Sequence, residues 1–292
     1  PDAATYVGSG KARELAGIVA QDEADTIVVD DDLPPSQRRA LEDATKVKVV
    51  DRTAVILDIF AQHATSREGK AQVELAQLEY MLPRLRGWGG SLSRQAGGRA
   101  AGDAGIGSRG PGETKIEMDR RVIRSRIAKL RRQIAQMAPA RDVKRGARRR
   151  FGLPTVAVVG YTNAGKSSLT NRLTGSAELV ENALFATLDT AVRRAKAKDG
   201  RLYAYVDTVG FVRRLPTQLI EAFKSTLEEV ADADLIVHVV DGSHPDPFSQ
   251  IDAVNDVLSD IDGVETIPTI VAFNKADRMD EAARERIEAL MP

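Results

Sequence analysis

Residues 160–167 read Gly160-Tyr161-Thr162-Asn163-Ala164-Gly165-Lys166-Ser167 and decide the fold of the second half of this chain. They follow an apolar run, 155–159, and precede residues 168–173, which have helical character. A strand, the spacing GxxxxGK[ST] and a helix in this order indicate a phosphate-binding loop, in which backbone N–H groups and the helix N-terminus face one anion. We predict that this loop binds a polyphosphate, that Lys166 reaches its β and γ phosphates, and that Ser167 offers its hydroxyl to Mg²⁺.

Two later motifs make GTP the expected ligand. Residues 202–206 read as a strand that ends in Asp207-Thr208-Val209-Gly210, where Asp207 is predicted to hold a magnesium-bound water and the Gly210 N–H to contact the γ phosphate. Residues 270–273 read as a buried strand that ends in Asn274-Lys275-Ala276-Asp277. The Asp277 carboxylate can accept two hydrogen bonds from guanine that adenine cannot supply, and a buried acceptor left unpaired costs about 1 to 3 kcal/mol. The three motifs predict an α/β P-loop GTPase that converts GTP to GDP and phosphate.

The segment 182–190, Asn-Ala-Leu-Phe-Ala-Thr-Leu-Asp-Thr, lies where a GTPase needs its first switch. Either Thr187 or Thr190 can give magnesium its second protein hydroxyl, and the other is then an ordinary turn threonine. Many GTPases carry a water-orienting glutamine after the glycine of the second motif, but this chain has Phe211 there. Because phenylalanine cannot orient water by hydrogen bonding, we expect slow intrinsic hydrolysis that draws on the backbone, another side chain, a cation or a partner.

Length and composition indicate a stably folded cytoplasmic protein. A chain of 292 residues buries roughly 75% of its unfolded surface, so it needs no disulfide bonds, and the sequence has no cysteine. No apolar run approaches the roughly 18 to 20 residues of a membrane span, and no signal-peptide pattern opens the chain. The chain begins at Pro1 and stops at Pro292, soon after Asp277, so we expect it to be trimmed at both ends.

The net charge of zero hides a basic segment. Residues 120–150 hold 13 Lys or Arg against one acid, Asp142, which leaves 29 basic and 41 acidic residues for the rest of the chain. This segment therefore carries +12 and the rest −12. Such a run is often only a solvated helix face, but a one-sided excess over about thirty residues is also the footprint of a polyanion binder. We interpret it as an RNA contact.

The first 150 residues are predicted to form a small α/β lobe, 1–66, and a helical hairpin, 67–150. In the lobe, strands are expected at 26–30 and 47–50 and helices at 34–44 and 51–63, and Gly8-Ser9-Gly10-Lys11 is expected to be a glycine turn before a helix because the first glycine of a phosphate loop is missing. In the hairpin, apolar residues follow the spacing of helices that pack against each other. They are Leu75, Leu78, Leu82 and Leu85 on one helix and Ile123, Ile127, Leu130, Ile134 and Met137 on the other.

The segment 86–113, which joins these two helices, holds ten glycines and four arginines. A loop this long without structure of its own is either functional or a disordered linker. Its position at a hairpin tip, its separated arginines and the single tryptophan of the chain, Trp88, favour insertion into folded RNA. We predict that Arg94, Arg99 and Arg109 contact RNA.

Five segments together resemble the HflX family of bacterial translational GTPases over nearly the whole chain. They are Gly110-Pro-Gly-Glu-Thr-Lys-Ile-Glu117, the loop 160–167, Phe185-Ala-Thr-Leu-Asp189, Asp207-Thr-Val-Gly-Phe211 and Asn274-Lys-Ala-Asp277. The resemblance implies an N-terminal HflX domain, made of the lobe and the hairpin, followed by a Ras-like GTPase domain, 151–292, which lacks its last base-contacting loop. It places Phe185, Thr187 and Asp189 at the nucleotide and favours Thr187 as the magnesium ligand.

The resemblance also implies binding to the large ribosomal subunit and its rRNA, with no DNA or membrane partner. We predict a monomeric GTPase that dissociates or rescues stalled ribosomes, with Lys166, Thr187 and Gly210 acting in hydrolysis. One alternative is an RNA-binding ribosome-assembly GTPase without splitting activity, and another is an RNA-remodelling NTPase. Asn163 occupies the loop position at which asparagine binds K⁺ in several GTPases that the motif resembles. K⁺ would supply a missing positive charge there, or Asn163 only braces the loop.

Overall fold

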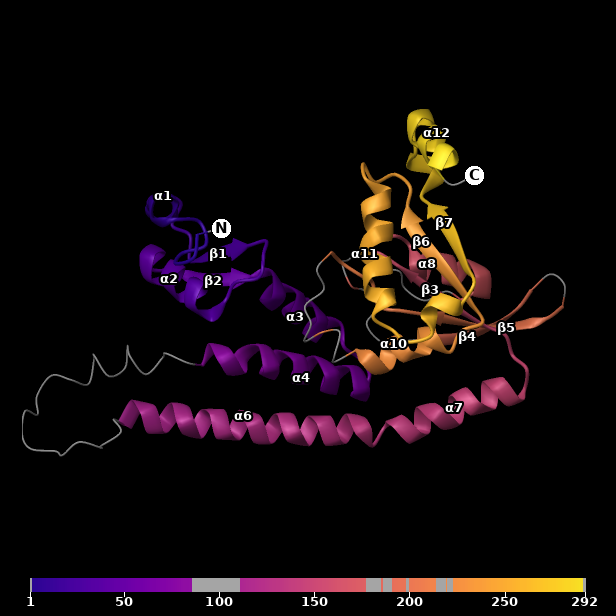
Figure 1. The fold of residues 1–292 in the computed structure, drawn as a ribbon, viewed down its shortest axis with the longest axis horizontal. Helices are drawn as coiled ribbons and strands as arrows, with labels where there is room; N and C mark the ends of the chain where they lie inside the picture. Colours follow the sequence, from indigo (N-terminus) through magenta and orange to yellow (C-terminus); the bar gives the residue numbers. More distant parts are fainter. Residues whose placement is uncertain are drawn as a thin grey trace, which may run out of the picture. The chain divides into compact units, whose positions relative to one another are not determined.

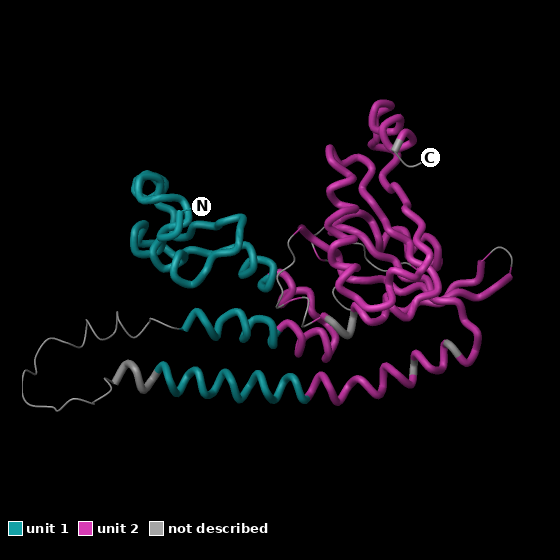
Figure 2. The backbone as a smooth tube through the Cα atoms, viewed as in Figure 1, with its two compact units in different colours: residues 1–58, 74–132 teal, residues 59–73, 133–292 magenta. Residues whose placement is uncertain are grey.

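The computed structural model of this chain describes residues 2–85, 111–176, 185, 191–197, 200–213, 219 and 223–290. The chain forms two compact units, residues 1–58 with 74–132 and residues 59–73 with 133–292 (Figure 2). Each unit thus takes part of the predicted N-terminal domain, because the divisions fall inside helices rather than at the predicted boundaries after residues 66 and 150. Those domain boundaries stay predictions.

The first unit contains the predicted α/β lobe. Its elements are α1 (Ser9–Gln21), β1 (Thr26–Val29), α2 (Pro35–Thr45), β2 (Lys48–Asp51) and the start of α3 (Arg52–His63). The two strands pair in parallel, with Thr26 opposite Lys48. Ala12, Leu33 and Leu41 form its core together with Val49. Helix α1 begins directly after Gly8, whose φ of +83° suits glycine, so the prediction of a glycine turn is confirmed.

Three helices follow the lobe in the sequence: α4 (Arg67–Arg84), α6 (Pro111–Ala135) and α7 (Ala138–Arg150). Within the first unit, residues 74–84 of α4 run beside α6 in the opposite direction (Figure 1). Leu75 and Leu130 are buried, and Glu74 and Glu79 form ion pairs with Arg126 and Arg131. The predicted helices and their antiparallel course are confirmed, while the tip with Arg94, Arg99 and Arg109 lies outside the described residues.

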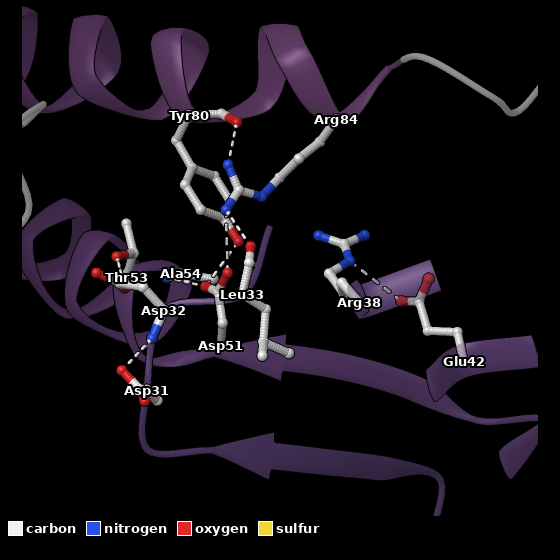
Figure 3. A network of polar contacts seen from close by, with 10 residues as sticks. All are labelled: Asp31, Asp32, Leu33, Arg38, Glu42, Asp51, Thr53, Ala54, Tyr80 and Arg84. Atoms are coloured by element: carbon white, nitrogen blue, oxygen red, sulfur yellow. Dashed lines mark hydrogen bonds and ion pairs between the residues drawn. The ribbon is translucent and has the colours of Figure 1, made fainter. Parts of the chain in front are cut away.

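A buried carboxylate ties the last turn of α4 to the lobe (Figure 3). Asp51, fully buried at the end of β2, accepts hydrogen bonds from Tyr80 Oη at 2.7 Å, Arg84 Nη2 at 3.1 Å and the Ala54 N–H at 2.9 Å. Arg84 also donates to the carbonyl oxygens of Leu33 and Tyr80, and its guanidinium lies 3.5 Å from the centre of the Tyr80 ring. Burial and the Asp51 hydrogen bond raise the pKa of Tyr80 to about 12. Because the buried Asp51 carboxylate pairs with Arg84, the network orients the helix end that leads into residues 86–110.

The second unit is built on a five-stranded sheet with the strand order β4-β5-β3-β6-β7. The strands are β3 (Thr155–Gly160), β4 (Ala191–Lys196), β5 (Leu202–Asp207), β6 (Leu235–Asp241) and β7 (Thr269–Asn274), and the helices that accompany them are α8 (Lys166–Thr174), α10 (Lys224–Ala231), α11 (Pro247–Ser259) and α12 (Glu281–Leu290). All neighbouring strands are parallel except β4, which runs antiparallel to β5. Parallel strands end at the same edge of the sheet, so β3, β5 and β7 bring all three predicted motifs to one side.

The predicted basic segment 120–150 is divided between two roles. Five of its arginines form ion pairs with acidic residues of this chain: Arg126 and Arg131 with α4, Arg141 with Glu68, Arg145 with Asp142 and Asp232, and Arg148 with Glu229. Other side chains of α6 are exposed, namely Arg121, Arg124, Lys129 and Arg132. Part of the charge excess is therefore neutralised within the chain. The predicted RNA contact then depends on the exposed basic side chains of α6.

The pairs between α7 and α10 are largely removed from water. Arg148 Nη2 lies 2.5 Å from Glu229 Oε2, and the two side chains are 10% and 9% exposed. Arg145 Nη1 lies 2.8 Å from Asp232 Oδ2, next to the last residue of α10. Among the described residues, no helix has both the length and the apolar character needed to cross a membrane.

We predict that Arg148→Met destabilises the second unit by about 3 kcal/mol, because it leaves the Glu229 carboxylate buried without its partner. The double variant Arg148→Met/Glu229→Leu should recover most of this loss, since a buried pair and an apolar pair of similar volume are often equal in stability. Urea unfolding of the single and double variants measures both free energies. Arg150→Met, at the exposed end of α7, is the control and should change stability by less than about 0.5 kcal/mol. An equal loss in the single and double variants would contradict the coupling.

Candidate nucleotide-binding site

The phosphate loop begins where β3 ends and depends on two glycines. Gly160 has a φ of +151°, and a Cβ at this position would overlap the carbonyl oxygen of Val239 on β6. Gly165 has a φ of +97° directly before α8, and a Cβ there would overlap the Asn274 side chain. Between them Asn163 is exposed and also takes a left-handed conformation, with φ +59°. The loop therefore has the close backbone approach that a phosphate cradle requires, and the prediction of strand, loop and helix is confirmed.

Lys166 is the first residue of α8 and is only 6% exposed. Its Nζ donates a hydrogen bond to the Tyr161 carbonyl oxygen at 3.0 Å, which holds the side chain across the loop. Burial lowers the pKa of Lys166 to about 8, and the Asp207 carboxylate acts in the opposite direction. A buried ammonium with few partners gains most from an anion, so this group is suited to bind phosphate.

The second motif lies against the first. Asp207 ends β5 and is fully buried, and Thr208 Oγ1 donates to the Val158 carbonyl oxygen at 2.8 Å. A Cβ on Gly210 would lie 2.7 Å from Thr162 Cγ2 and 3.2 Å from Lys166 Nζ. Because Thr162 Cα would also lie only 2.9 Å from such a Cβ, glycine is what allows this loop to lie so close to the phosphate loop.

Phe211 joins the two loops by its backbone and packs into the core by its side chain. Its N–H donates to the Gly160 carbonyl oxygen at 3.1 Å, and its carbonyl oxygen accepts from the Thr162 N–H at 2.8 Å. The ring is fully buried in a cluster with Leu227 and Val230. The side chain at the position of the usual glutamine thus points away from the nucleotide site, and slow intrinsic hydrolysis stays a prediction.

The base motif is connected directly to the phosphate loop. Asn274 Nδ2 donates to the Ala164 carbonyl oxygen at 2.8 Å, and Lys275 Nζ lies 2.7 Å from Asp241 Oδ2. Asp277 is exposed in the short 3₁₀ helix η2 (Ala276–Arg278). The three motifs predicted from separate stretches of sequence are therefore brought together in one unit.

The sequence did not point to Asp241, which holds Lys275 in place. Burial acts to raise the pKa of Asp241, but hydrogen bonds from Lys275 and Ser243 outweigh burial and lower this pKa. Its position at the end of β6, opposite Asn274 in the sheet, is the signal that would have identified it.

His238 is buried in β6. Its Nε2 atom has no hydrogen-bond partner among the described residues. Burial and the nearby Lys166 ammonium lower the pKa of His238 to about 4, and the ring is therefore neutral at physiological pH.

The candidate magnesium ligands are only partly described. Ser167 lies in the first turn of α8, and the buried Asp207 acts electrostatically on Lys166 beside it. P-loop GTPases hold Mg²⁺ through a serine or threonine of this loop and an aspartate of the second motif, and these two residues fit that requirement. Thr187 and Asp189 lie outside the described residues. Phe185 is described, and its ring packs against Phe60. Its predicted contact with the nucleotide stays a prediction.

Three protein-family models match the chain. Residues 1–61 match the GTP-binding GTPase N-terminal region, 63–148 the GTP-binding GTPase middle region, and 155–275 the 50S ribosome-binding GTPase. The chain is 51% identical over 277 residues to a GTPase HflX of Caldanaerobacter subterraneus subsp. tengcongensis, covering 95% of this chain and 63% of that protein. It is 46% identical over 277 residues to GTPase HflX of Escherichia coli K12, covering 94% of this chain and 63% of that protein.

The chain thus spans about 63% of the length of these relatives. Among solved structures it is similar to SsGBP in a complex with GDP, with a TM-score of 0.51 and 26% identity over 99% of this chain and 76% of that one. The N-terminal, middle and GTPase segments follow one another in the predicted order, and the phosphate, switch and base motifs meet at one edge of the sheet. On these grounds the chain belongs to the HflX family of GTPases.

Proposed function

We propose that this protein is a GTP-hydrolysing translation factor that binds the large ribosomal subunit and dissociates or rescues stalled ribosomes. The observation that carries the proposal is the joined site, in which Asn274 of the base motif is hydrogen-bonded to the phosphate loop at Ala164. The match of residues 155–275 to the 50S ribosome-binding GTPase supports the choice of partner. A ribosomal partner also places the protein in the cytoplasm.

In this proposal the phosphate loop binds the β and γ phosphates through its N–H groups and Lys166, and the exposed Asp277 receives the guanine edge. Mg²⁺, when bound, neutralises charge that develops on the phosphates. Ser167 and Thr187 would offer it hydroxyl oxygens, and Asp207 would hold one of its waters. The Gly210 N–H would donate a hydrogen bond to the γ phosphate, a contact that is made with GTP and lost with GDP.

GTP then stabilises the switch segments in the form that fits the ribosome, and hydrolysis removes the contacts that hold them. Binding linkage makes this effect mutual: a ribosome that favours the GTP form raises GTP affinity by the factor by which GTP raises ribosome affinity. The glycine-rich tip, with Arg94, Arg99 and Arg109, and the exposed basic face of α6 would contact rRNA.

Sedimentation of 70S ribosomes with the full-length protein tests the function. GTP and a non-hydrolysable GTP analogue should both convert 70S particles into subunits, whereas ATP should not. Binding to the large subunit without a change in the 70S fraction would favour an assembly GTPase. Equal activity with ATP would favour an RNA-remodelling NTPase.

The charge on Lys166 gives the first prediction for the site. Lys166→Ala and Ser167→Ala should each abolish hydrolysis without unfolding the chain, because one loses the cation that faces the phosphates and the other a magnesium ligand. Since the pKa of Lys166 is about 8, nucleotide affinity of the unchanged protein should fall as the pH rises from 7 to 9.5 and the ammonium loses its proton. Titration with a fluorescent GDP analogue measures this, and Lys166→Met should bind weakly at every pH. Lys48→Ala, an exposed change in β2, is the control, and turnover of Lys166→Ala at the normal rate would contradict the assignment.

A second prediction concerns ribosome binding. Arg94→Glu/Arg99→Glu should weaken co-sedimentation with large subunits and reduce stimulation of hydrolysis by ribosomes, because reversed charges repel rRNA phosphates. Hydrolysis without ribosomes should stay nearly unchanged. The control, Arg13→Glu/Lys48→Glu, reverses the same amount of charge on the exposed surface of the lobe. Unchanged co-sedimentation of the tip variant would favour the disordered-linker interpretation.

A third prediction tests the cation at Asn163. If K⁺ binds the Asn163 amide oxygen and stabilises charge on the phosphates, hydrolysis should be faster in K⁺ than in Na⁺ at equal ionic strength. In other GTPases, the positive charge that an arginine finger adds at the phosphates raises the rate by about 10³-fold to 10⁵-fold. Asn163→Ala should remove the difference between the salts. The control, Ser168→Ala, changes an exposed residue directly after the loop 160–167 and should keep the difference. Equal rates in both salts would leave the ribosome as the source of activation.

A further inference from the structure

Phe185 has a backbone conformation that its side chain disfavours. Its φ is +59°, in the left-handed region, where a bulky residue without a glycine's freedom is an outlier. The side chain is also 4% exposed. Such a conformation persists only where surrounding contacts determine it, and strained residues of this kind are frequent at functional sites.

The contact is an aromatic cluster centred on Phe60. The Phe60 ring lies 4.6 Å from the Phe185 ring at 62°, and 5.2 Å from the Phe223 ring at 60°, both edge-to-face. Phe60 is fully buried and Phe223 is 2% exposed. Edge-to-face packing is a favoured geometry for aromatic rings, so Phe60 holds two other rings in defined orientations.

The three rings come from segments with different roles. Phe60 lies in α3, within residues 1–61 that match the GTP-binding GTPase N-terminal region. Phe185 stands two residues before Thr187, the proposed magnesium ligand. Phe223 directly precedes α10, which follows the γ-phosphate loop at 207–210 in the chain. All three belong to the second compact unit. One ring from the N-terminal region therefore contacts two rings of the GTPase segment, one two residues before the proposed magnesium ligand and one at the start of α10.

Helix α10 is held at both of its ends by residues that precede the GTPase domain. Phe223, at its beginning, packs on Phe60, and Asp232, directly after its last residue, pairs with Arg145 of α7 at 2.8 Å. The Leu227 N–H donates a hydrogen bond to the Phe223 carbonyl oxygen at 3.0 Å, so the backbone of Phe223 is joined to the first turn of α10. A displacement of α10 would therefore change the Phe60 contact.

We propose that Phe60 is a positioning residue for GTP hydrolysis: it fixes Phe185, and thereby the start of the segment that carries Thr187, and it couples this segment to α10. This inference rests on the proposed function. It assigns to the N-terminal region a direct part in ordering the GTPase site, in addition to ribosome contact.

The test compares GTP with GDP, because the two ligands differ in the γ phosphate, which is the group that the switch segments contact. Phe60→Leu keeps an apolar side chain but removes the ring. It should weaken binding of a fluorescent non-hydrolysable GTP analogue about fivefold to tenfold, the range expected from lost ring contacts, and lower kcat. Affinity for the matching GDP analogue should change less than about twofold.

Two further variants separate positioning from general loss of packing. Leu41→Ala, in the core of the lobe, should destabilise the protein and leave the ratio of GTP to GDP affinity unchanged. Phe185→Leu should show the same selective loss of GTP affinity, and the double variant should be no worse than Phe60→Leu alone, because Phe60→Leu already breaks the contact with Phe185. Unfolding measurements confirm that each variant is folded at the assay temperature.

Equal losses of GTP and GDP affinity in Phe60→Leu, or none, would overturn the inference, as would additive effects of Phe60→Leu and Phe185→Leu. These outcomes are distinct from failure of the proposed function. If the unchanged protein does not bind GTP or hydrolyse it, the function fails. If it does both and Phe60→Leu has no selective effect, only the positioning role fails.

Discussion

The hydrogen bond from Asn274 Nδ2 to the Ala164 carbonyl oxygen, 2.8 Å long, is the contact on which the nucleotide site depends. It joins the end of β7 to the loop after β3, two strands that are separated in the sheet by β6. The approach is possible because Gly165 has no side chain where the Asn274 amide lies. In the proposed function, a guanine at Asp277 and a phosphate at Lys166 would thereby be held in one frame, so the base and the phosphates would be recognised at a single edge of the sheet.

Charge has two uses in this chain, and burial distinguishes them. Exposed ion pairs such as Arg126–Glu74 contribute little to stability, whereas Arg148 and Glu229 are each about one-tenth exposed and are costly to separate. The second kind fixes α7 to α10 and therefore determines how the helix that leaves the N-terminal region enters the GTPase unit. The exposed face of α6 keeps its basic side chains in water, where they can meet a polyanion at little desolvation cost.

The sequence predicted the parts of the fold that depend on local pattern. Apolar runs that lead into Gly160, Asp207 and Asn274 identified β3, β5 and β7, and the three motifs identified the candidate site. Strand β4 was not predicted, because Arg193, Arg194 and Lys196 give an edge strand a polar pattern with no apolar run. Nor does a run of arginines state which of them have acidic partners, since Glu229 and Asp232 lie some eighty residues away in the chain. Asp241 and Phe60 were missed for the same reason: their roles come from tertiary contacts that no local spacing encodes.

The strain at Phe185 bears on how GTP hydrolysis is controlled in the proposed function. A bulky residue in the left-handed region costs of order 1 to 3 kcal/mol, and the edge-to-face contact of Phe185 with Phe60 contributes about 0.5 to 1.5 kcal/mol beyond the area it buries. The ring contact offsets part of this strain, so the conformation at Phe185, in the segment before Thr187, depends on Phe60. A ligand needs only about 5.5 kcal/mol of differential affinity to move a two-state equilibrium from one side almost completely to the other. With Phe211 buried in the core and unable to orient water, control of hydrolysis by the ordering of this segment is physically more accessible than control by a catalytic side chain.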